Sequence, residues 1–382
     1  MRIAYVINSL EGGGAAAPVP AVTKVLKAQG AEIEVFALIR RDGRALDAMR
    51  AAGLVVHVRD GAEKDHLAAL AWLDRQIAAF KPDVIWTSLT RATLLGQLVG
   101  LRRRLPVVSW QHAAYLKPAN RMLLRATQRL SRLWIGDSNN VTCLTARRLA
   151  VPPERLTTWP LFAARGDAPV ARPWRPGETV ELGTLGRLHR VKGYDVLIEA
   201  LVILKASGFT PPAPIRIRIA GDGAQRQALA AKIAAAKLDN VELVGFQEQP
   251  RAFLASLHVY LQPSRSEGLC IAAHEAMEAG LPLIVSAVGE LPFSVLDERT
   301  GLVVPPGDAE ALAKALERLL AHPERLGDLG RASRERVLER FGAASFERIG
   351  AEIYARLPTT RAKARRTAGR RSQSSLASDR SA

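Results

Sequence analysis

The sequence predicts an α/β protein made of two doubly wound domains. Segments typical of buried strands alternate with segments typical of helices along both halves of the chain, which indicates parallel sheets covered by helices. The chain has 382 residues, more than a single hydrophobic core normally accommodates. A Pro-rich stretch from Ala163 to Gly177 separates the two alternating series and is typical of a linker.

The first half of the chain is expected to form a complete strand–helix series. Hydrophobic periodicity predicts strands over 2–9, 32–38, 54–58, 83–88 and 106–110. The helices expected between and after them span 18–29, 46–52, 66–80, 93–103 and 119–134.

The second series runs from Val180 to Ala321. It opens with a strand over 180–186, a turn over 187–193 and a helix over 194–206. A short buried strand over 259–262 is broken at Pro263 and followed by an Ala-rich helix over 269–279. We therefore expect a first domain at 1–165, a linker at 166–178, a second domain at 179–340, a helix at 341–360 that crosses back to the first domain, and a disordered basic tail at 361–382.

Composition narrows the class of protein. Hydrophobic residues make up 48% of the chain and the mean hydropathy is +0.01, as in soluble globular proteins. The two cysteines, Cys143 and Cys270, do not support a disulfide framework and fit a reducing cytoplasm. The apolar run at Met1–Leu10 is too short for a signal peptide, and no apolar run is long enough to cross a membrane.

Two glutamates lie eight positions apart across a predicted loop-to-helix junction. Glu267 falls in the loop and Glu275 in the helix, whose free N–H groups near Leu269 and Cys270 would attract an anion such as a diphosphate. Carboxylates beside a phosphate site suit ligands rich in hydroxyl groups. On these residues alone, an ordinary helix with solvated glutamates is an equal alternative.

Two cations occupy the turn after the strand over 180–186. A helix N-terminus stabilises an anion by only roughly 0.3–2 kcal/mol, too little by itself for a diphosphate. Arg187 offers a planar fork for phosphate oxygens and Lys192 a mobile charge. The alternative is a solvated basic turn.

Together these segments resemble the retaining glycosyltransferases of the GT-B fold, in the large family 4 (group 1) that uses nucleotide-sugar donors. The matching motifs, in chain order, are Gly186-Arg187-Leu188, Lys192-Gly193, Ala220-Gly221-Asp222-Gly223, Val244-Gly245-Phe246, Pro263-Ser264-Arg265-Ser266-Glu267-Gly268 and Glu275-Ala276-Met277. The resemblance implies two Rossmann-like domains that face a central cleft.

The resemblance also implies roles for single residues. Glu267 would contact hydroxyls of the donor sugar, Glu275 the nucleotide ribose, and Arg187 with Lys192 the diphosphate. The turn that holds Phe246 would contact the base, and Gly268, Leu269 and Cys270 would complete the donor site.

Two features of the first domain are expected at the carboxyl ends of strands, where ligands gather in open α/β sheets. The loop Glu11-Gly12-Gly13-Gly14 follows the first strand, and its Gly13 and Gly14 would let a donor approach the backbone closely. His112 follows the strand that ends at Trp110, and the resemblance implies that it contacts the donor sugar and leaving phosphate as a catalytic residue beside Glu267. A simple turn and a structural histidine are the alternatives.

The chain departs from the family pattern at two places. Leu269-Cys270 stands where many members have Phe-Gly, and Gly289-Glu290-Leu291-Pro292-Phe293 differs from the usual Gly-Gly and Pro-Glu. Donor sugar and base therefore stay open. No Asp-any-Asp motif occurs, so we expect neither a metal nor a cofactor beyond the nucleotide diphosphate sugar. No nucleophile is placed for double displacement, and the resemblance implies a same-face mechanism.

Positive charge is large and uneven. The net charge is +17, and the tail from Arg361 contributes +6, from seven Lys or Arg against Asp379. The stretch 84–136 carries nine Lys or Arg and no acid, with four arginines on one face of its predicted helix: Arg121, Arg125, Arg129 and Arg132. We expect a cytoplasmic protein that attaches peripherally to the anionic inner face of a membrane and uses a hydroxyl acceptor, such as a lipid-linked glycan of polysaccharide or lipopolysaccharide synthesis. A merely solvated basic face is the alternative.

Three rival functions stay open at this stage. A nucleotide-sugar epimerase of similar fold would need no acceptor, and a donor-binding relic would not turn over. A nucleic-acid-binding protein would fit a pI near 10.6. Nucleic acid is nevertheless not expected, because no recognised module occurs and aromatics are only 5% of residues.

Overall fold

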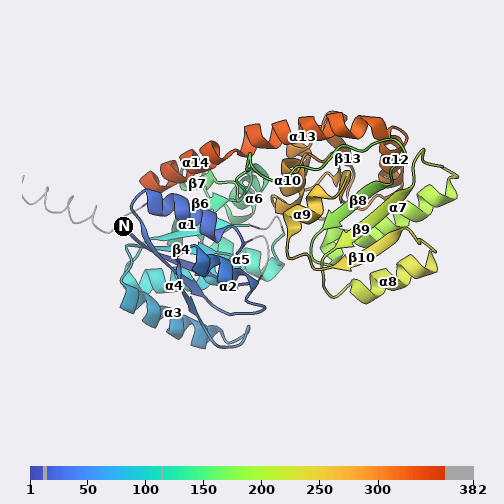
Figure 1. Cartoon of the computed structure of the whole chain (residues 1–382). Coiled ribbons are helices and arrows are strands. Elements are labelled where there is room, and N and C mark those ends of the chain that lie inside the picture. Colours follow the sequence, from blue (N-terminus) through green and yellow to red (C-terminus); the bar gives the residue numbers. More distant parts are fainter. Residues whose placement is uncertain (12–14, 113–114, 358–382) are drawn as a thin grey trace, which may run out of the picture. The chain divides into compact units, whose positions relative to one another are not determined.

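The chain folds into two compact units, each built on one parallel sheet. The computed structural model describes residues 1–11, 15–112 and 115–357 (Figure 1). One unit comprises Met1–Leu161 with the described residues from Glu347 on, and the other Phe162–Phe346. Each sheet is flanked by helices that connect its strands. The predicted fold class, two Rossmann-like doubly wound domains, is confirmed.

Unit 1 contains a seven-stranded sheet. Its strands are β1 (Arg2–Ile7), β2 (Glu32–Ala37), β3 (Val55–Val58), β4 (Val84–Ser88), β5 (Val107–Gln111), β6 (Ser131–Gly136) and β7 (Leu156–Thr158). They pair in parallel in the order β3-β2-β1-β4-β5-β6-β7. The order reverses between β1 and β4, so the carboxyl ends of these two strands mark the switch point of the sheet.

The helices of unit 1 connect successive strands. They are α1 (Val19–Ala28), α2 (Arg44–Ala51), α3 (His66–Phe80), α4 (Thr90–Arg103), α5 (Pro118–Thr127) and α6 (Asn139–Leu149), with the 3-10 turns η1 (Gln128–Leu130) and η2 (Pro153–Arg155). The central strands are apolar and buried along almost their whole length, as expected for a sheet covered on both faces. Trp86, Trp110 and Trp159 meet in the core, with the Trp110 and Trp159 rings stacked at 5.1 Å.

One predicted helix is wrong in its second half. The helix expected over 119–134 ends at Thr127, and after η1 the chain continues as strand β6. Leu133, Trp134 and Ile135 are buried in β6, which pairs with β5, so burial in the sheet overrides the helical spacing of the arginines. Arg132 therefore lies on a strand and not on the helix face predicted for it.

Unit 2 contains a six-stranded sheet. Its strands are β8 (Val180–Leu185), β9 (Ile215–Ala220), β10 (Val241–Gly245), β11 (Val259–Gln262), β12 (Leu283–Ser286) and β13 (Gly301–Val304). They pair in parallel in the order β10-β9-β8-β11-β12-β13, which reverses between β8 and β11. The segments that follow β8 and β11 therefore flank the switch point of this sheet.

The helices of unit 2 are α7 (Tyr194–Ala206), α8 (Arg226–Ala235), α9 (Pro250–Ala255), α10 (Ile271–Glu278), α11 (Leu291–Ser294), α12 (Ala309–Leu320) and α13 (Leu326–Phe341), with the 3-10 turns η3 (Arg190–Lys192) and η4 (Pro323–Arg325). The last helix, α14 (Ala343–Arg356), begins in unit 2, and its residues from Glu347 belong to unit 1. There Gly350 lies so close to Trp159 and Val25 that a side chain at this position would clash with both.

Candidate functional site

The two segments at the switch point of unit 2 touch through their backbones. Gly193 ends η3 with φ +69°, and a Cβ there would overlap the carbonyl oxygen of Pro263, which follows β11. Only glycine combines this left-handed conformation with so close an approach. The contact brings Lys192, after β8, beside Glu267, after β11.

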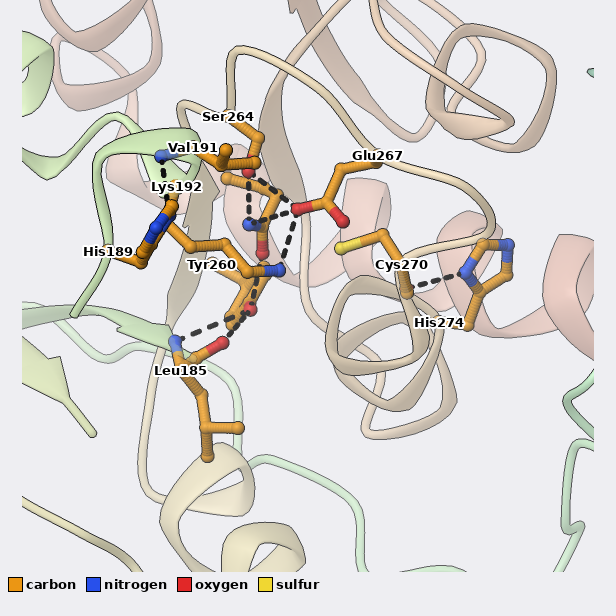
Figure 2. A network of polar contacts seen from close by, with 10 residues as sticks. Leu185, His189, Val191, Lys192, Tyr260, Ser264, Glu267, Cys270 and His274 are labelled. Atoms are coloured by element: carbon orange, nitrogen blue, oxygen red, sulfur yellow. Dashed lines mark hydrogen bonds and ion pairs between the residues drawn. The ribbon is translucent and has the colours of Figure 1, made fainter. Parts of the chain in front are cut away.

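Glu267 accepts hydrogen bonds from three side chains (Figure 2). Its Oε1 lies 2.7 Å from Lys192 Nζ, 2.7 Å from Ser264 Oγ and 3.2 Å from Gln262 Nε2. Gln262 also donates to Ser264 Oγ at 2.8 Å, and both of these side chains are fully buried. The position of the carboxylate is therefore set by a buried polar network and not by solvent.

A second layer orients that network. The Tyr260 hydroxyl lies 2.8 Å from Gln262 Oε1 and accepts a hydrogen bond from the Leu185 amide at 3.4 Å. Because the Gln262 oxygen is held by Tyr260, its amide nitrogen points to Ser264 and Glu267. Sequence reasoning missed Tyr260 and Gln262, although both lie in the buried strand directly before the motif.

Lys192 stays charged in this setting. Burial opposes the charged ammonium, but the attraction of Glu267 and their hydrogen bond outweigh it, so the pKa of Lys192 rises above its usual value. An ammonium has three N–H donors and Glu267 takes one of them. The chemistry of this pair suits a ligand that combines phosphate with hydroxyl groups.

Cys270 adopts a left-handed backbone conformation where α10 begins. Its φ is +66° and ψ is +74°, and the first helical residue is Ile271, so the helix starts later than the predicted Leu269. A residue with a side chain rarely adopts this conformation, which accounts for the glycine that many family members have here.

The Cys270 thiol belongs to the same cluster. Figure 2 shows the Cys270 sulfur beside the Glu267 carboxylate. Burial, reinforced by the negative charge of Glu267, raises the pKa of Cys270. The sulfur is therefore a protonated donor at neutral pH and not a nucleophilic thiolate.

Glu275 lies on α10 in a separate ionic group. Arg251 of α9 lies 3.8 Å from Glu275 Oε1 and donates to Glu278 Oε2 at 3.0 Å. Burial raises the pKa of Glu275, the Arg251 charge opposes this effect, and Glu278 adds to it. Hydrogen-bond donors on a bound ligand would therefore stabilise the charged form of Glu275. Arg251 was missed, because no motif in the sequence contains it.

The remaining predicted residues of unit 2 lie at strand ends of the same sheet. Phe246 follows β10 after Gly245, whose φ is +77°, and its ring is 49% exposed. Arg187 is exposed in the turn between β8 and η3. The Gly268 carbonyl accepts a hydrogen bond from the Glu290 amide at 2.9 Å, and Leu269 is buried.

In unit 1, His112 is buried beside the end of β4. Its Nε2 lies 2.5 Å from Ser88 Oγ, and its Nδ1 lies 3.9 Å from Asp137 Oδ2. Burial lowers the pKa of His112 to about 3, so the ring is neutral at physiological pH. Sequence reasoning did not select Ser88 or Asp137. Ser88 ends β4 and Asp137 follows β6, so the rule that ligands gather at the carboxyl ends of strands applies to both as it does to His112.

The remaining predicted site residues lie on several different elements or outside the described residues. Gly13, Gly14 and the basic tail lie outside the described residues. Arg121 and Arg125 lie on α5, whereas Arg129 lies in η1 and Arg132 on β6. Among residues 1–11, 15–112 and 115–357, no helix has both the length and the apolar character needed to cross a membrane.

Comparison with known families and proteins gives a consistent assignment. The family model for "Glycosyl transferases group 1" matches residues 173–336, and that for "Glycosyltransferase Family 4" matches residues 12–162. Together they cover most of the chain, with one model on each of its two halves.

Similar proteins belong to the same class. The chain is 28% identical to the putative colanic acid biosynthesis glycosyltransferase WcaL of Salmonella typhimurium over 71% of this chain and 68% of that protein. It is 34% identical to the amylovoran biosynthesis glycosyltransferase AmsK of Erwinia amylovora over 60% of this chain and 55% of that protein. The chain spans about half the length of the curated relatives that it matches, between 40% and 68%.

Solved structures share the fold over nearly the whole chain. The crystal structure of Anabaena HepE in complex with UDP-glucose superposes with a TM-score of 0.79 at 18% identity, over 94% of this chain and all of that one. The predicted resemblance to the group 1, or family 4, glycosyltransferases is thus confirmed. The chain belongs to the group 1, or family 4, glycosyltransferases and has their GT-B fold.

Proposed function

We propose that the protein is a retaining glycosyltransferase that moves a sugar from a nucleotide diphosphate sugar to a hydroxyl acceptor. The observation that carries the proposal is the pair Lys192–Glu267, 2.7 Å apart at the switch point of the unit 2 sheet. A cation for phosphate and a carboxylate for sugar hydroxyls lie side by side where ligands of such sheets bind.

In this proposal the leaving diphosphate is stabilised by positive charge from the chain itself. Lys192 and Arg187 contact the phosphates, and the first N–H groups of α10 face the same charge. No metal is required for this step. EDTA treatment should leave the rate unchanged, and a loss of rate that Mg²⁺ or Mn²⁺ restores would contradict metal independence.

The remaining residues take the roles that the family resemblance implies. Glu267 orients the transferred sugar, Glu275 holds the ribose, and Phe246 contacts the base. Gly13, Gly14, Gly268, Leu269 and Cys270 complete the donor site. In unit 1, His112 acts as a neutral hydrogen-bonding group in catalysis, consistent with its lowered pKa.

The names of the relatives and the charge of the chain support our proposals for the acceptor and the location. WcaL and AmsK are named for colanic acid and amylovoran biosynthesis, which supports an envelope polysaccharide or lipopolysaccharide acceptor, such as a lipid-linked glycan. The acid-free basic stretch supports peripheral attachment at the cytoplasmic face of a membrane.

The proposal is tested by product analysis. The HepE complex contains UDP-glucose, so we would begin with this donor and then vary base and sugar. We expect the sugar to be transferred to an added glycan acceptor with the donor's anomeric configuration. NMR of the product measures that configuration. Inverted product would contradict retention, and a changed sugar nucleotide with donor alone would favour the epimerase.

A further inference from the structure

Helices α5 and α6 of unit 1 enclose a groove of about 920 Å³. Arg121, Arg125 and Met122 line it from α5, and Leu144, Arg147 and Arg148 line it from α6. The arginines thus come from two helices that are separated in sequence by η1 and β6. Sequence periodicity grouped Arg121 and Arg125 with Arg129 and Arg132, but neither of the latter lines the groove.

The groove is strongly basic. Four of its lining residues are arginines, and neither helix contains an acidic residue. Within the described part of the chain, Arg121, Arg125 and Arg147 have no carboxylate within ion-pair distance. Arg121 and Arg125 lie four residues apart on one helix, where like charges repel. Such a cluster is stabilised by an anion that contacts several guanidinium groups together.

Apolar side chains stand exposed beside these charges. Met122 is 67% exposed and Leu123 is 46% exposed, whereas Leu124 is fully buried and anchors α5 to the unit. An exposed apolar pair next to arginines is typical of a helix at a membrane interface, where guanidinium groups contact lipid phosphates and apolar side chains enter the acyl boundary. A soluble phosphate or a nucleic-acid backbone would give Met122 and Leu123 nothing to contact.

We propose that the α5–α6 groove docks the protein on an anionic phospholipid bilayer. Lipid phosphates lie among Arg121, Arg125, Arg147 and Arg148, while Met122 and Leu123 enter the boundary between headgroups and acyl chains. The inference deepens the peripheral attachment of the proposed function and names its surface. It does not depend on the Lys192–Glu267 pair, which lies on unit 2.

The test is co-sedimentation with vesicles of phosphatidylcholine alone and of phosphatidylcholine with phosphatidylglycerol. The full chain should bind the anionic vesicles preferentially. Each basic residue near an anionic surface contributes about 1 kcal/mol, so Arg121→Gln with Arg147→Gln should lower the partition coefficient by about thirtyfold. Equal binding of the wild type to both vesicles would overturn the proposal.

The matched control is Arg129→Gln with Arg132→Gln. This pair removes the same amount of positive charge from unit 1 but lies outside the groove, so binding should fall by less than about threefold because distance screens its charge. An equal fall in vesicle binding for both double variants would overturn docking through the groove. It would instead indicate diffuse attraction between the basic surface and the membrane.

A third variant separates a membrane from other polyanions. Met122→Ser with Leu123→Ser keeps every charge, and it should weaken vesicle binding most at high salt, where the apolar contribution remains. Unchanged vesicle binding by this variant, together with its tight binding to duplex DNA, would overturn the proposal in favour of a nucleic-acid surface.

Folding and donor binding serve as independent controls. All three variants should keep the far-UV circular dichroism of the wild type and its thermal stabilisation by UDP. A variant that loses vesicle binding but keeps stabilisation by UDP supports the groove. If the wild type binds anionic vesicles through the groove but no nucleotide diphosphate stabilises it, the proposed function fails and the docking surface stands.

Discussion

Lys192 Nζ lies 2.7 Å from Glu267 Oε1, although 75 residues separate the two in sequence. Their side chains are 22% and 10% exposed, so the pair is largely shielded from solvent. The strand order of unit 2 makes the contact possible, because β8 and β11 are neighbours at the point where the order reverses. The ammonium and the carboxylate are thereby held together by the fold itself.

The two glutamates should have different kinetic roles. Glu267→Gln keeps the shape of the network but weakens the hold on sugar hydroxyls, so kcat should fall. Glu275→Gln should mainly raise the KM for the donor, because ribose binding contributes to ground state and transition state alike. Steady-state kinetics with varied donor separates the effects. Identical kinetic constants in wild type and both variants would contradict the assignments.

Cys270 should tolerate glycine far better than valine. Valine has about the right volume but is β-branched, and the left-handed conformation at φ +66° is unfavourable for such residues. We expect Cys270→Val to be less stable than Cys270→Gly by roughly 2 kcal/mol or more. Urea unfolding measures the difference, with Cys270→Ala as the control for loss of the thiol. Equal stability of the valine and glycine variants would show that the backbone at position 270 leaves the left-handed conformation without loss of stability.

His112 should act as a neutral group. Replacement by alanine should lower the rate by about 10²–10⁴, the range for a positioned polar or proton-transfer group. Because the pKa of His112 is lowered to about 3, the wild-type rate should show no step from this residue between about pH 5 and 8. A rate loss below about threefold would make His112 structural.

Buried His274 should make the fold sensitive to acid. It bonds Cys270 O and Ser294 Oγ at 2.9 Å each, and burial lowers its pKa from 6.5 to about 4. A histidine with a lowered folded pKa contributes stability that is complete above its unfolded pKa and is lost as the pH falls toward the folded one.

The corresponding measurement compares wild type with His274→Gln. Between about pH 7.5 and about pH 5, the wild type should lose roughly 2 kcal/mol more unfolding free energy than the variant. Urea unfolding at both pH values gives this difference. If the variant loses as much stability as the wild type, His274 does not titrate as its burial implies.

The local sequence pattern predicted most of the helices and strands. The helix over 194–206 has the predicted bounds, because its apolar spacing and the glycine before it agree with its tertiary setting. The prediction of a helix over 119–134 failed because Ser131–Gly136 is a strand that pairs with β5 and β7. The periodicity of exposed arginines carries no information about that pairing.

The candidate site was only partly predictable for a related reason. Glu267, Glu275 and Lys192 belong to motifs, and motifs are local. Arg251, Tyr260 and Ser88 act through partners that are distant in sequence or lie on neighbouring strands, and strand order decides those contacts. The arginine groove shows the same limit, because Arg147 joins Arg121 only through the packing of α6 against α5.

Nucleotide binding to wild type, Lys192→Ala and Arg187→Ala tests the central claim most directly. A matching nucleotide diphosphate at about 100 times its dissociation constant should stabilise the wild type by about 2.7 kcal/mol in thermal unfolding. Each replacement should weaken binding by about 1.5–3 kcal/mol and thus remove most of that stabilisation. If no nucleotide diphosphate stabilises the wild type, or if both variants are stabilised as strongly as the wild type, the assignment of this site to the donor diphosphate is contradicted.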